Sequence, residues 1–245
     1  MTQSAFALSD TGRVRKDNED AFRLLPDHGL FIVSDGMGGK NAGATAAKLV
    51  VDNLPPMIKE RVDSISSRQS KAISTALRDS LVDLCNNVRK EAERTVERRG
   101  MGATVVLAYL RGSRAYIANM GDSRAYLYRD RKLEQLTDDH SIVGILLKDE
   151  EITEEEARIH PARGIVSRYV GMEGMVYADV KSIRVSKGDV LLLCSDGLTG
   201  MMEDEAISEV LSTSGDLHQS CQSLIDAANQ AGGRDNITVL LAQIE

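Results

Sequence analysis

Apolar runs separated by short polar segments dominate the chain and predict buried strands. Two of these runs lead directly into an aspartate, residues 30–34 into Asp35 and residues 190–195 into Asp196. Apolar runs of this length are typical of buried strands. The full set of expected strands covers residues 4–9, 20–25, 29–34, 103–110, 114–119, 123–128, 132–136, 179–185, 189–195 and 236–244.

Other segments have the apolar spacing of helices. Residues 41–60 predict a helix that the pair Pro55-Pro56 ends or bends. Residues 69–98 predict a long amphipathic helix that stops at Gly100. Two more helices are expected at about 203–212 and 216–230.

The connections indicate how the strands pair. Loops as short as Gly121-Asp122 predict antiparallel neighbours, and the turn at 26–29 predicts a hairpin. Residues 137–175 are charged and irregular, with one short helix opened by a capping box of Thr153 and Glu156. A segment of this length in a compact domain is usually functional, and we expect a flap at about 140–175. The predicted fold is α+β, a central sandwich of two antiparallel sheets flanked by helices on both sides.

Composition narrows the class of protein. The 245 residues show no repeat or linker, which favours a single domain over 1–245. A net charge of −7 with scattered basic residues argues against nucleic acid and anionic membranes as partners. Three cysteines without a CxxC pair predict reduced, packed thiols. Without a membrane-length apolar stretch or a signal-peptide pattern, we expect a cytoplasmic protein.

Acidic motifs far apart in the chain carry the candidate chemistry. They are Asn18-Glu19-Asp20, Asp35-Gly36-Met37-Gly38-Gly39, Gly121-Asp122, Ser195-Asp196-Gly197 and Arg234-Asp235-Asn236. Converging aspartates at the ends of buried strands repel one another unless a cation lies between them. A carboxylate site suits Mg²⁺ or Mn²⁺, the metals of phosphoryl chemistry.

Each motif alone has an ordinary alternative. Asp35-Gly36 is also a common turn, Gly38-Gly39 permits a sharp bend as well as a phosphate cradle, and Asp122 is a normal hairpin residue. Asp235-Asn236 is also typical of the turn after a helix. Only the coincidence of several such acids in one chain favours a metal site.

Other phosphate chemistries lack their residues here. No cysteine has an arginine six positions later, no Asp-x-Asp occurs, and Gly39-Lys40 is followed by Asn41 rather than Ser or Thr. The four histidines lack metal-ligand spacing. Metal-activated water is the simplest remaining nucleophile.

The ordered set of motifs, with Arg15-Lys16-Asp17 before the first and Gly121-Asp122-Ser123-Arg124 in the middle, resembles the metal-dependent type 2C (PPM) Ser/Thr protein phosphatases in their bacterial form. The resemblance runs from about residue 8 to 244. It implies two to three Mn²⁺ or Mg²⁺ ions and hydrolysis of phosphate monoesters by a water that bridges two of them.

The resemblance also implies roles for single residues. Asp35 would bridge two metals, the Gly36 carbonyl would bind one of them, and Asp196 and Asp235 would complete the second. Glu19 and Asp20 would hold metal-bound waters or ligate directly. Arg15 would clamp the substrate phosphate, a task that suits a guanidinium. Asp122 with Asp196 resembles a third metal site.

One departure leaves the proton donor open. Eukaryotic members carry a histidine where this chain has Met37, so the leaving alkoxide needs another acid. His160, in the flap, is the candidate general acid, and its alternative role is to pack or cap the flap. The flap also reads Lys148-Asp149-Glu150-Glu151 where relatives usually have a glycine.

Three hypotheses follow. The first is a cytoplasmic, monomeric phosphoserine/phosphothreonine protein phosphatase acting on Ser/Thr kinases and their targets. The second is a partner-switching phosphatase for a single signalling protein. The third is a metal-binding pseudophosphatase, against which the intact acidic set argues.

Overall fold

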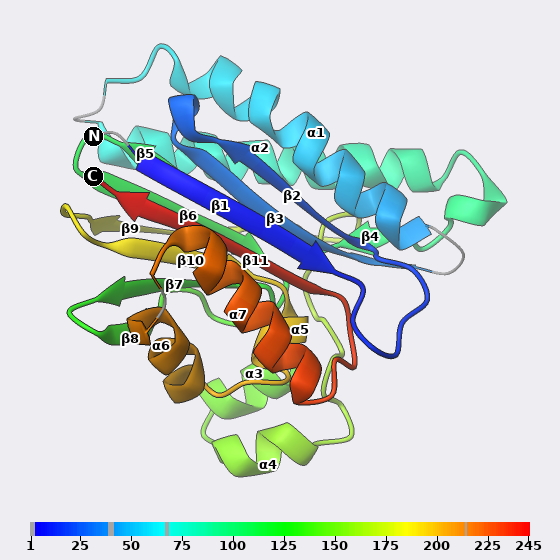
Figure 1. Cartoon of the computed structure of the whole chain (residues 1–245). Helices are drawn as coiled ribbons and strands as arrows, with labels where there is room; N and C mark the ends of the chain where they lie inside the picture. Colours follow the sequence, from blue (N-terminus) through cyan, green and yellow to red (C-terminus); the bar gives the residue numbers. More distant parts are fainter. Residues whose placement is uncertain (1–2, 39–41, 67–68, 214) are drawn as a thin grey trace.

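The computed structural model describes residues 3–38, 42–66, 69–213 and 215–245, and it contains two antiparallel sheets face to face with helices outside them (Figure 1). One sheet has the strand order β1 (Gln3–Asp10), β11 (Ile237–Ile244), β10 (Val190–Cys194), β7 (Arg124–Arg129), β8 (Lys132–Gln135). The other has the order β2 (Asp20–Leu25), β3 (Leu30–Met37), β5 (Val105–Arg111), β6 (Arg114–Met120), β9 (Asp179–Arg184), and the short β4 (Gly102–Ala103) pairs with β3. This is the fold class that the sequence predicts.

Alternate side chains of β3 pack into two different hydrophobic cores. Leu30 and Ile32 pack with the helices above the sheet, whereas Phe31 and Val33 pack between the two sheets. Successive side chains of a strand point to opposite faces, so a continuous apolar run is needed where both faces are buried. The strand therefore lies in the middle of the molecule, and Asp35 near its end is carried to the edge of both cores.

The helices form the outer layers (Figure 1). The pair α1 (Ala42–Val62) and α2 (Ser70–Ala92) covers one sheet, and α6 (Asp204–Thr213) with α7 (Leu217–Gln230) covers the other. The shorter helices are α3 (Ile142–Lys148), α4 (Glu154–Ile159), α5 (Asp196–Thr199), η1 (Pro26–His28) and η2 (Val96–Arg98). In the described part of the chain, no helix combines the length and apolar character needed to cross a membrane.

Helix α1 continues through its two prolines, so the prediction that they could end it is wrong. Proline at position 55 has no N–H for the carbonyl of Val51, and Arg23 Nε donates to that carbonyl instead, at 3.3 Å. Arg23 also forms an ion pair with Asp52, one residue further. The Arg23 side chain from β2 thus replaces one of the hydrogen bonds that the helix loses at its prolines.

The expected helix over 69–98 is shorter than predicted, because α2 ends at Ala92. Val96, which the periodicity placed on the core face, is 71% exposed in η2. Arg94 and Arg98 both turn back to Glu91. A further helical turn would bury no apolar side chain here, so nothing favours it over the turn that forms.

The predicted pairing of 114–119 with 123–128 is also wrong. β6 pairs with β5 and β9, whereas β7 pairs with β10 and β8 in the other sheet. Gly121, at φ 113°, lies against Thr104 where an added Cβ would approach to 2.6 Å. The Gly121-Asp122 link therefore carries the chain from one layer to the other, and it leaves Asp122 between the layers rather than at a hairpin tip.

The segment 137–175 contains more helix than expected. The capping box of Thr153 and Glu156 is present at α4, as predicted. Helix α3, whose N-cap is the Ser141 side chain, was not predicted. Outside this segment, the single turn α5 directly after Ser195 was not predicted either. The three cysteines are free and buried, as expected of packed thiols.

Candidate active site

Antiparallel pairing brings the first two acids together. Asp20 begins β2 and lies directly opposite Asp35 on β3. Opposed residues of an antiparallel pair share one face, with Cβ atoms about 4.5–5.5 Å apart. The Asp35 backbone is held in turn by Thr104, whose N–H donates to the Asp35 carbonyl at 2.8 Å and whose Oγ1 accepts from the Asp35 N–H at 2.9 Å. The two carboxylates are therefore fixed as neighbours by the sheet itself.

The residue after Asp35 packs against the start of α1. Gly36 donates its N–H to the Glu19 carbonyl at 3.1 Å. A Cβ added to Gly36 would lie 2.1 Å from the Gly43 carbonyl oxygen, so only glycine fits. A Cβ on Gly43 would in turn lie 2.7 Å from both the Gly36 oxygen and Glu19 Oε1. The Gly36 carbonyl and the Glu19 carboxylate thus share one neighbour, as two oxygen donors of one site would.

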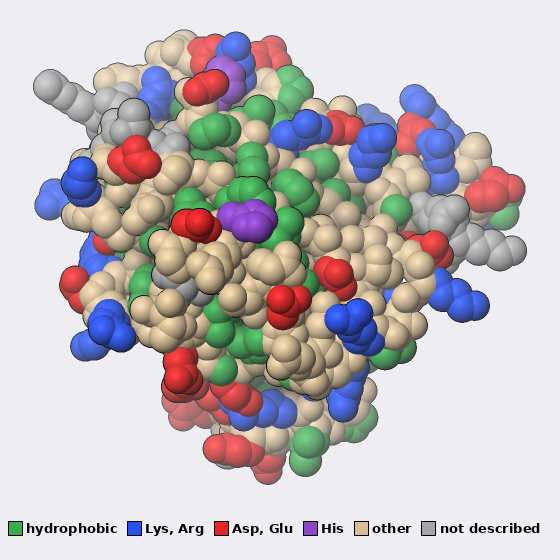
Figure 2. Space-filling view, viewed as in Figure 1, with side chains coloured by type: hydrophobic (Ala, Val, Ile, Leu, Met, Phe, Trp, Pro, Cys, Tyr) green, Lys and Arg blue, Asp and Glu red, His purple; other side chains and the backbone are tan. Residues whose placement is uncertain are grey.

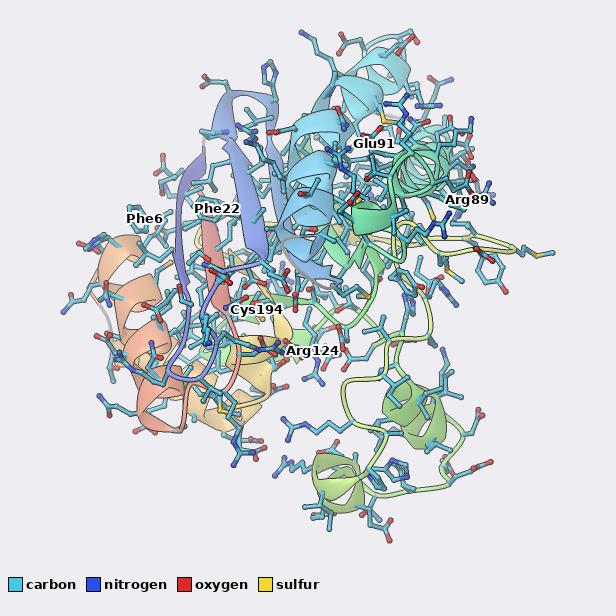
Figure 3. All side chains as sticks on the ribbon, turned by 90° about the vertical axis from the view of Figure 1, so that its right-hand side faces the viewer. Phe6, Phe22, Arg89, Glu91, Arg124 and Cys194 are labelled. Carbon is cyan, nitrogen blue, oxygen red and sulfur yellow. The ribbon has the colours of Figure 1, made fainter. Side chains whose placement is uncertain are left out.

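The other sheet supplies Asp196. β10 ends at Cys194, which is opposite Arg124 at the start of β7, and both residues lie at this end of the sandwich (Figure 3). Asp196 follows two residues later, at the start of α5. The Asp196 charge contributes to the raised pKa of Asp35, so the two carboxyl groups are neighbours in the site. Neighbouring buried carboxylates repel each other unless a proton or a cation lies between them.

Asp235 closes the site from the loop before β11. Its Oδ2 accepts from Arg15 Nη2 at 2.6 Å, and its Oδ1 accepts from the Asn236 N–H at 2.9 Å. The Asn236 side chain holds the loop that carries Arg15. Its Nδ2 donates to the carbonyls of Thr11 and Asp17 at 2.9 and 3.0 Å, and its Oδ1 accepts from the Glu19 N–H at 2.8 Å.

The pKa values of the carboxyl groups report their crowding. Burial, and then the charges of the other acids, raise the pKa of Asp35 well above its usual value. Burial also raises the pKa of Asp20 and of Asp122 to about 7, and the Asp196 charge adds to both. The pKa of Asp196 is raised by burial and by Asp235. The pKa values of four aspartates are raised, and the charge of a fifth, Asp235, contributes to three of these shifts, so the five acids form one site rather than separate turns.

Two of these carboxyl groups have a buried oxygen without a hydrogen-bond donor among the described residues. They are Asp20 Oδ1 and Asp196 Oδ1. A buried acceptor left unpaired costs about 1–3 kcal/mol, and more when it is charged. A divalent cation bound by oxygen ligands offsets both this cost and the mutual repulsion. The donor set therefore fits Mg²⁺ or Mn²⁺.

The carboxylates do not by themselves complete a coordination shell. Within residues 3–38, 42–66, 69–213 and 215–245, no three His, Cys, Asp or Glu side chains are gathered as a ready metal site. Mg²⁺ usually keeps several of its waters when a protein binds it, so side chains alone need not complete its coordination shell. Waters and the Gly36 carbonyl would provide the remaining ligands.

The flap is fastened beside the site by residues that the sequence analysis did not single out. Arg163 Nη2 donates to the Gly200 carbonyl at 2.9 Å, and Arg158 forms an ion pair with Glu203. At the base of the flap, His140 accepts from the Gly121 N–H through Nδ1 at 3.2 Å and contacts Asp179 through Nε2 at 2.8 Å. These contacts could not be predicted from the charged residues of the flap, because their partners are backbone atoms or residues distant in the sequence.

His160 lies at the C-terminal end of α4. Its Nδ1 accepts from the Ala162 N–H at 3.1 Å, which is the capping role foreseen as the alternative. No hydrogen bond or ion pair joins His160 to the five aspartates in the described part of the chain. Gly39, the second glycine of the possible phosphate cradle, lies outside the described residues.

Acidic side chains also gather on the surface of the flap. Figure 2 shows them at the lower edge of that view, over α4, whose first turn contains Glu154, Glu155 and Glu156. Lys and Arg side chains are scattered over the same view.

Comparison with known proteins gives consistent results. The family model described as protein phosphatase 2C matches residues 3–178, and the model of stage II sporulation protein E (SpoIIE) matches residues 162–245. The chain is similar to the serine/threonine phosphatase stp of Listeria monocytogenes, at 39% identity over 96% of this chain and 93% of the relative. It is also 32% identical to the protein phosphatase PhpP of Streptococcus pneumoniae, over 97% of this chain and 96% of that one.

Solved structures agree. The serine/threonine phosphatase Stp1 of Staphylococcus aureus has a TM-score of 0.90 and 36% identity, covering 100% of this chain and 96% of that chain. The catalytic domain of the serine/threonine protein phosphatase PstP in complex with two manganese ions has a TM-score of 0.82 and 30% identity, covering 98% and 97%.

Proposed function

The chain belongs to the protein phosphatase 2C family and is a serine/threonine protein phosphatase of the bacterial type, and we propose that it uses a metal-activated water as its nucleophile. Its substrates are phosphorylated proteins. The observation that carries the metal proposal is the convergence of five aspartates with two unpartnered buried oxygens. Two divalent cations held there would supply a water of lowered pKa and would neutralise charge on the phosphoryl group.

In this proposal the residues of the chain have distinct tasks. Asp35 would help to hold both cations. The Gly36 carbonyl, Glu19 and Asp20 would provide further oxygen ligands, or hold waters, for one cation, and Asp196 and Asp235 would do so for the other. Two observations support this division: Asp35 faces Asp20 within one sheet, and the charge of Asp196, from the other sheet, contributes to the raised pKa of Asp35.

Arg15 positions the substrate phosphate. Its side chain is 53% exposed, so a guanidinium face stays open to a ligand while Nη2 is paired with Asp235. A guanidinium matches phosphate oxygens in pairs and holds them for in-line attack. The leaving alkoxide needs a proton, and His160 is the proposed donor through Nε2, since its Nδ1 is already an acceptor. This role requires the flap to move toward the aspartates.

Asp122 and Asp196 would hold a third cation. The effect of Asp196 on Asp122 supports this, because the Asp196 charge contributes to the raised pKa of Asp122. We further propose that residues 1–245 form a single catalytic domain, monomeric and cytoplasmic, which opposes Ser/Thr kinases with two to three Mn²⁺ or Mg²⁺ ions. No structural observation favours the single-target phosphatase, and the gathered aspartates argue against a pseudophosphatase.

Phosphate release from a phosphothreonine peptide tests the proposal. Release should need Mn²⁺, stop with EDTA, and be abolished by Asp35→Asn. Asp27→Asn is the matched control, because Asp27 is exposed in η1, at the far end of the same hairpin. Wild-type turnover in EDTA, or in Asp35→Asn, would refute the metal-water mechanism.

A further inference from the structure

The two oxygens of the Asp20 carboxylate have very different surroundings. Oδ2 accepts two hydrogen bonds, from Ser195 Oγ and from Thr238 Oγ1, each at 2.7 Å. Oδ1 is buried, and no residue in the described part of the chain donates a hydrogen bond to it. Both hydroxyl residues are fully buried, so water does not compete for these bonds. Among the described residues, Oδ2 thus receives both hydrogen bonds and Oδ1 receives none.

The direction of every proton in this network can be assigned. Ser195 Oγ accepts from the Thr238 N–H at 2.9 Å and donates to Asp20 Oδ2 at 2.7 Å, since its other acceptor, the Asn236 carbonyl, is farther away at 3.5 Å. A carboxylate oxygen only accepts, so the Thr238 proton also points to Asp20. Ser9 Oγ lies 2.8 Å from Thr238 Oγ1 and must therefore donate to it, while it accepts from Asn18 Nδ2 at 2.8 Å. The hydrogen bonds donated by Asn18, Ser9, Thr238 and Ser195 in this network therefore all run toward the Asp20 carboxylate.

The sheet fixes this chain of donors rigidly. Ser9 on β1 is paired in register with Thr238 on β11, and the Ser195 N–H donates to the Thr238 carbonyl at 3.1 Å. The Asp20 N–H in turn donates to Asn18 Oδ1 at 3.1 Å, which closes the ring. Hydrogen bonds oriented in one direction polarise one another and are stronger than isolated ones.

We propose that Ser195 and Thr238 are positioning residues that orient the Asp20 carboxylate so that Oδ1 alone faces the metal site. The inference rests on the proposed function and deepens it. A role in folding alone would be expected to satisfy both oxygens, because an unpaired buried carboxylate oxygen is costly. Donors that act on one oxygen only favour the ionised carboxylate and turn its free lone pairs toward a cation. Residues that hydrogen-bond to metal ligands in this way tune the affinity for the metal.

Calorimetric titration of the whole, metal-stripped chain with Mn²⁺ tests this role. Thr238→Val keeps the shape but removes the donor, and Ser195→Ala removes the other. Each should weaken Mn²⁺ binding by roughly 10–100-fold. Thr238→Ser restores a hydroxyl and should retain near wild-type affinity. Ser9 is one hydrogen bond further from Asp20 than Thr238, so Ser9→Ala should weaken Mn²⁺ binding less than Thr238→Val does.

Ser80→Ala is the matched control. Ser80 is also fully buried, but its Oγ donates to the Ala76 carbonyl within α2 at 2.8 Å. Its Mn²⁺ affinity should equal that of the wild type, even where its melting temperature in EDTA falls. Folded Thr238→Val and Ser195→Ala that bind Mn²⁺ like the wild type would overturn the inference alone. A wild-type chain that binds no Mn²⁺ and releases no phosphate would overturn the proposed function as well.

Discussion

Arg15 Nη2 lies 2.6 Å from Asp235 Oδ2 and joins the loop before β2 to the loop before β11. The hydrogen bond to Asp235 is also the largest cause that raises the pKa of Arg15. The pair is only partly exposed, with 53% and 34% of the two side chains accessible. Asp235 thus holds the guanidinium at the rim of the aspartate cluster, where a substrate phosphate would arrive beside the metal ligands.

Replacing Arg15 with Ala should therefore reduce kcat/KM for a phosphothreonine peptide by roughly 10–100-fold, since a charge-assisted hydrogen bond contributes about 1.5–3 kcal/mol. Arg15→Lys keeps the charge but not the paired donors, so it should recover only part of the loss. Steady-state kinetics at saturating Mn²⁺ measure both variants. An unchanged kcat/KM in Arg15→Ala would show that the guanidinium contributes only the contact with Asp235.

Asn236 should matter for the same loop. Its side chain makes three hydrogen bonds to the backbone of residues 11–19, and it is only 5% exposed. Asn236→Ala should raise KM at least about tenfold, because Arg15 loses its fixed position, and a misplacement of about 1 Å can cost 100-fold. The variant should remain folded by circular dichroism. If KM is unchanged in a folded variant, the loop holds Arg15 without this amide.

Asp122 offers a test of the third metal. Asp122 lies on the link between the two sheets, its pKa is raised by burial and by Asp196, and its own charge contributes to the raised pKa of Asp35, so it belongs to the cluster. Asp122→Ala should weaken only the weakest Mn²⁺ site in a calorimetric titration and shift the Mn²⁺ demand of turnover upward. Catalysis with unaltered Mn²⁺ demand would show that Asp122 is merely structural.

Asp122 also shows where sequence reasoning failed. A two-residue link between two strand-like segments predicts a hairpin, but the link at Gly121-Asp122 passes from one sheet to the other. The strand pattern reports which residues are buried and not which strand is the neighbour. The pairing of β2 with β3, which aligns Asp20 with Asp35, was predicted correctly from the turn between them.

Along the chain, the acids of the candidate site could be found because each ends an apolar run or lies in a turn motif. The groups that orient them could not. Ser195 and Thr238 resemble ordinary strand residues, and only the register of β1 with β11 brings Ser9 to Thr238. The prediction that Val96 is buried was wrong for a related reason. The apolar periodicity continues to Val96, but it cannot show that the hydrophobic core ends before that residue.

The last prediction concerns the stability of the metal-free chain against pH. The pKa of Asp20 and Asp122 is about 7 in the folded chain, because burial disfavours their charged forms. An aspartate in the unfolded chain has a pKa of about 3.9. Between these values the folded chain binds more protons than the unfolded chain, so the free energy of unfolding falls as the pH rises.

In EDTA, the melting temperature should therefore fall as the pH is raised from about 5 to 8, with most of the loss complete once the pH exceeds the folded pKa values. We expect a drop of at least about 5 °C, since each kcal/mol corresponds to roughly 2–4 °C at this chain length. Asp20→Asn and Asp122→Asn should each flatten the profile, because neither amide titrates. Saturating Mn²⁺ should reverse the trend, since cations bind the ionised carboxylates more tightly as protons leave. A melting temperature in EDTA that rises over this range would mean that these aspartates are already ionised in the metal-free fold.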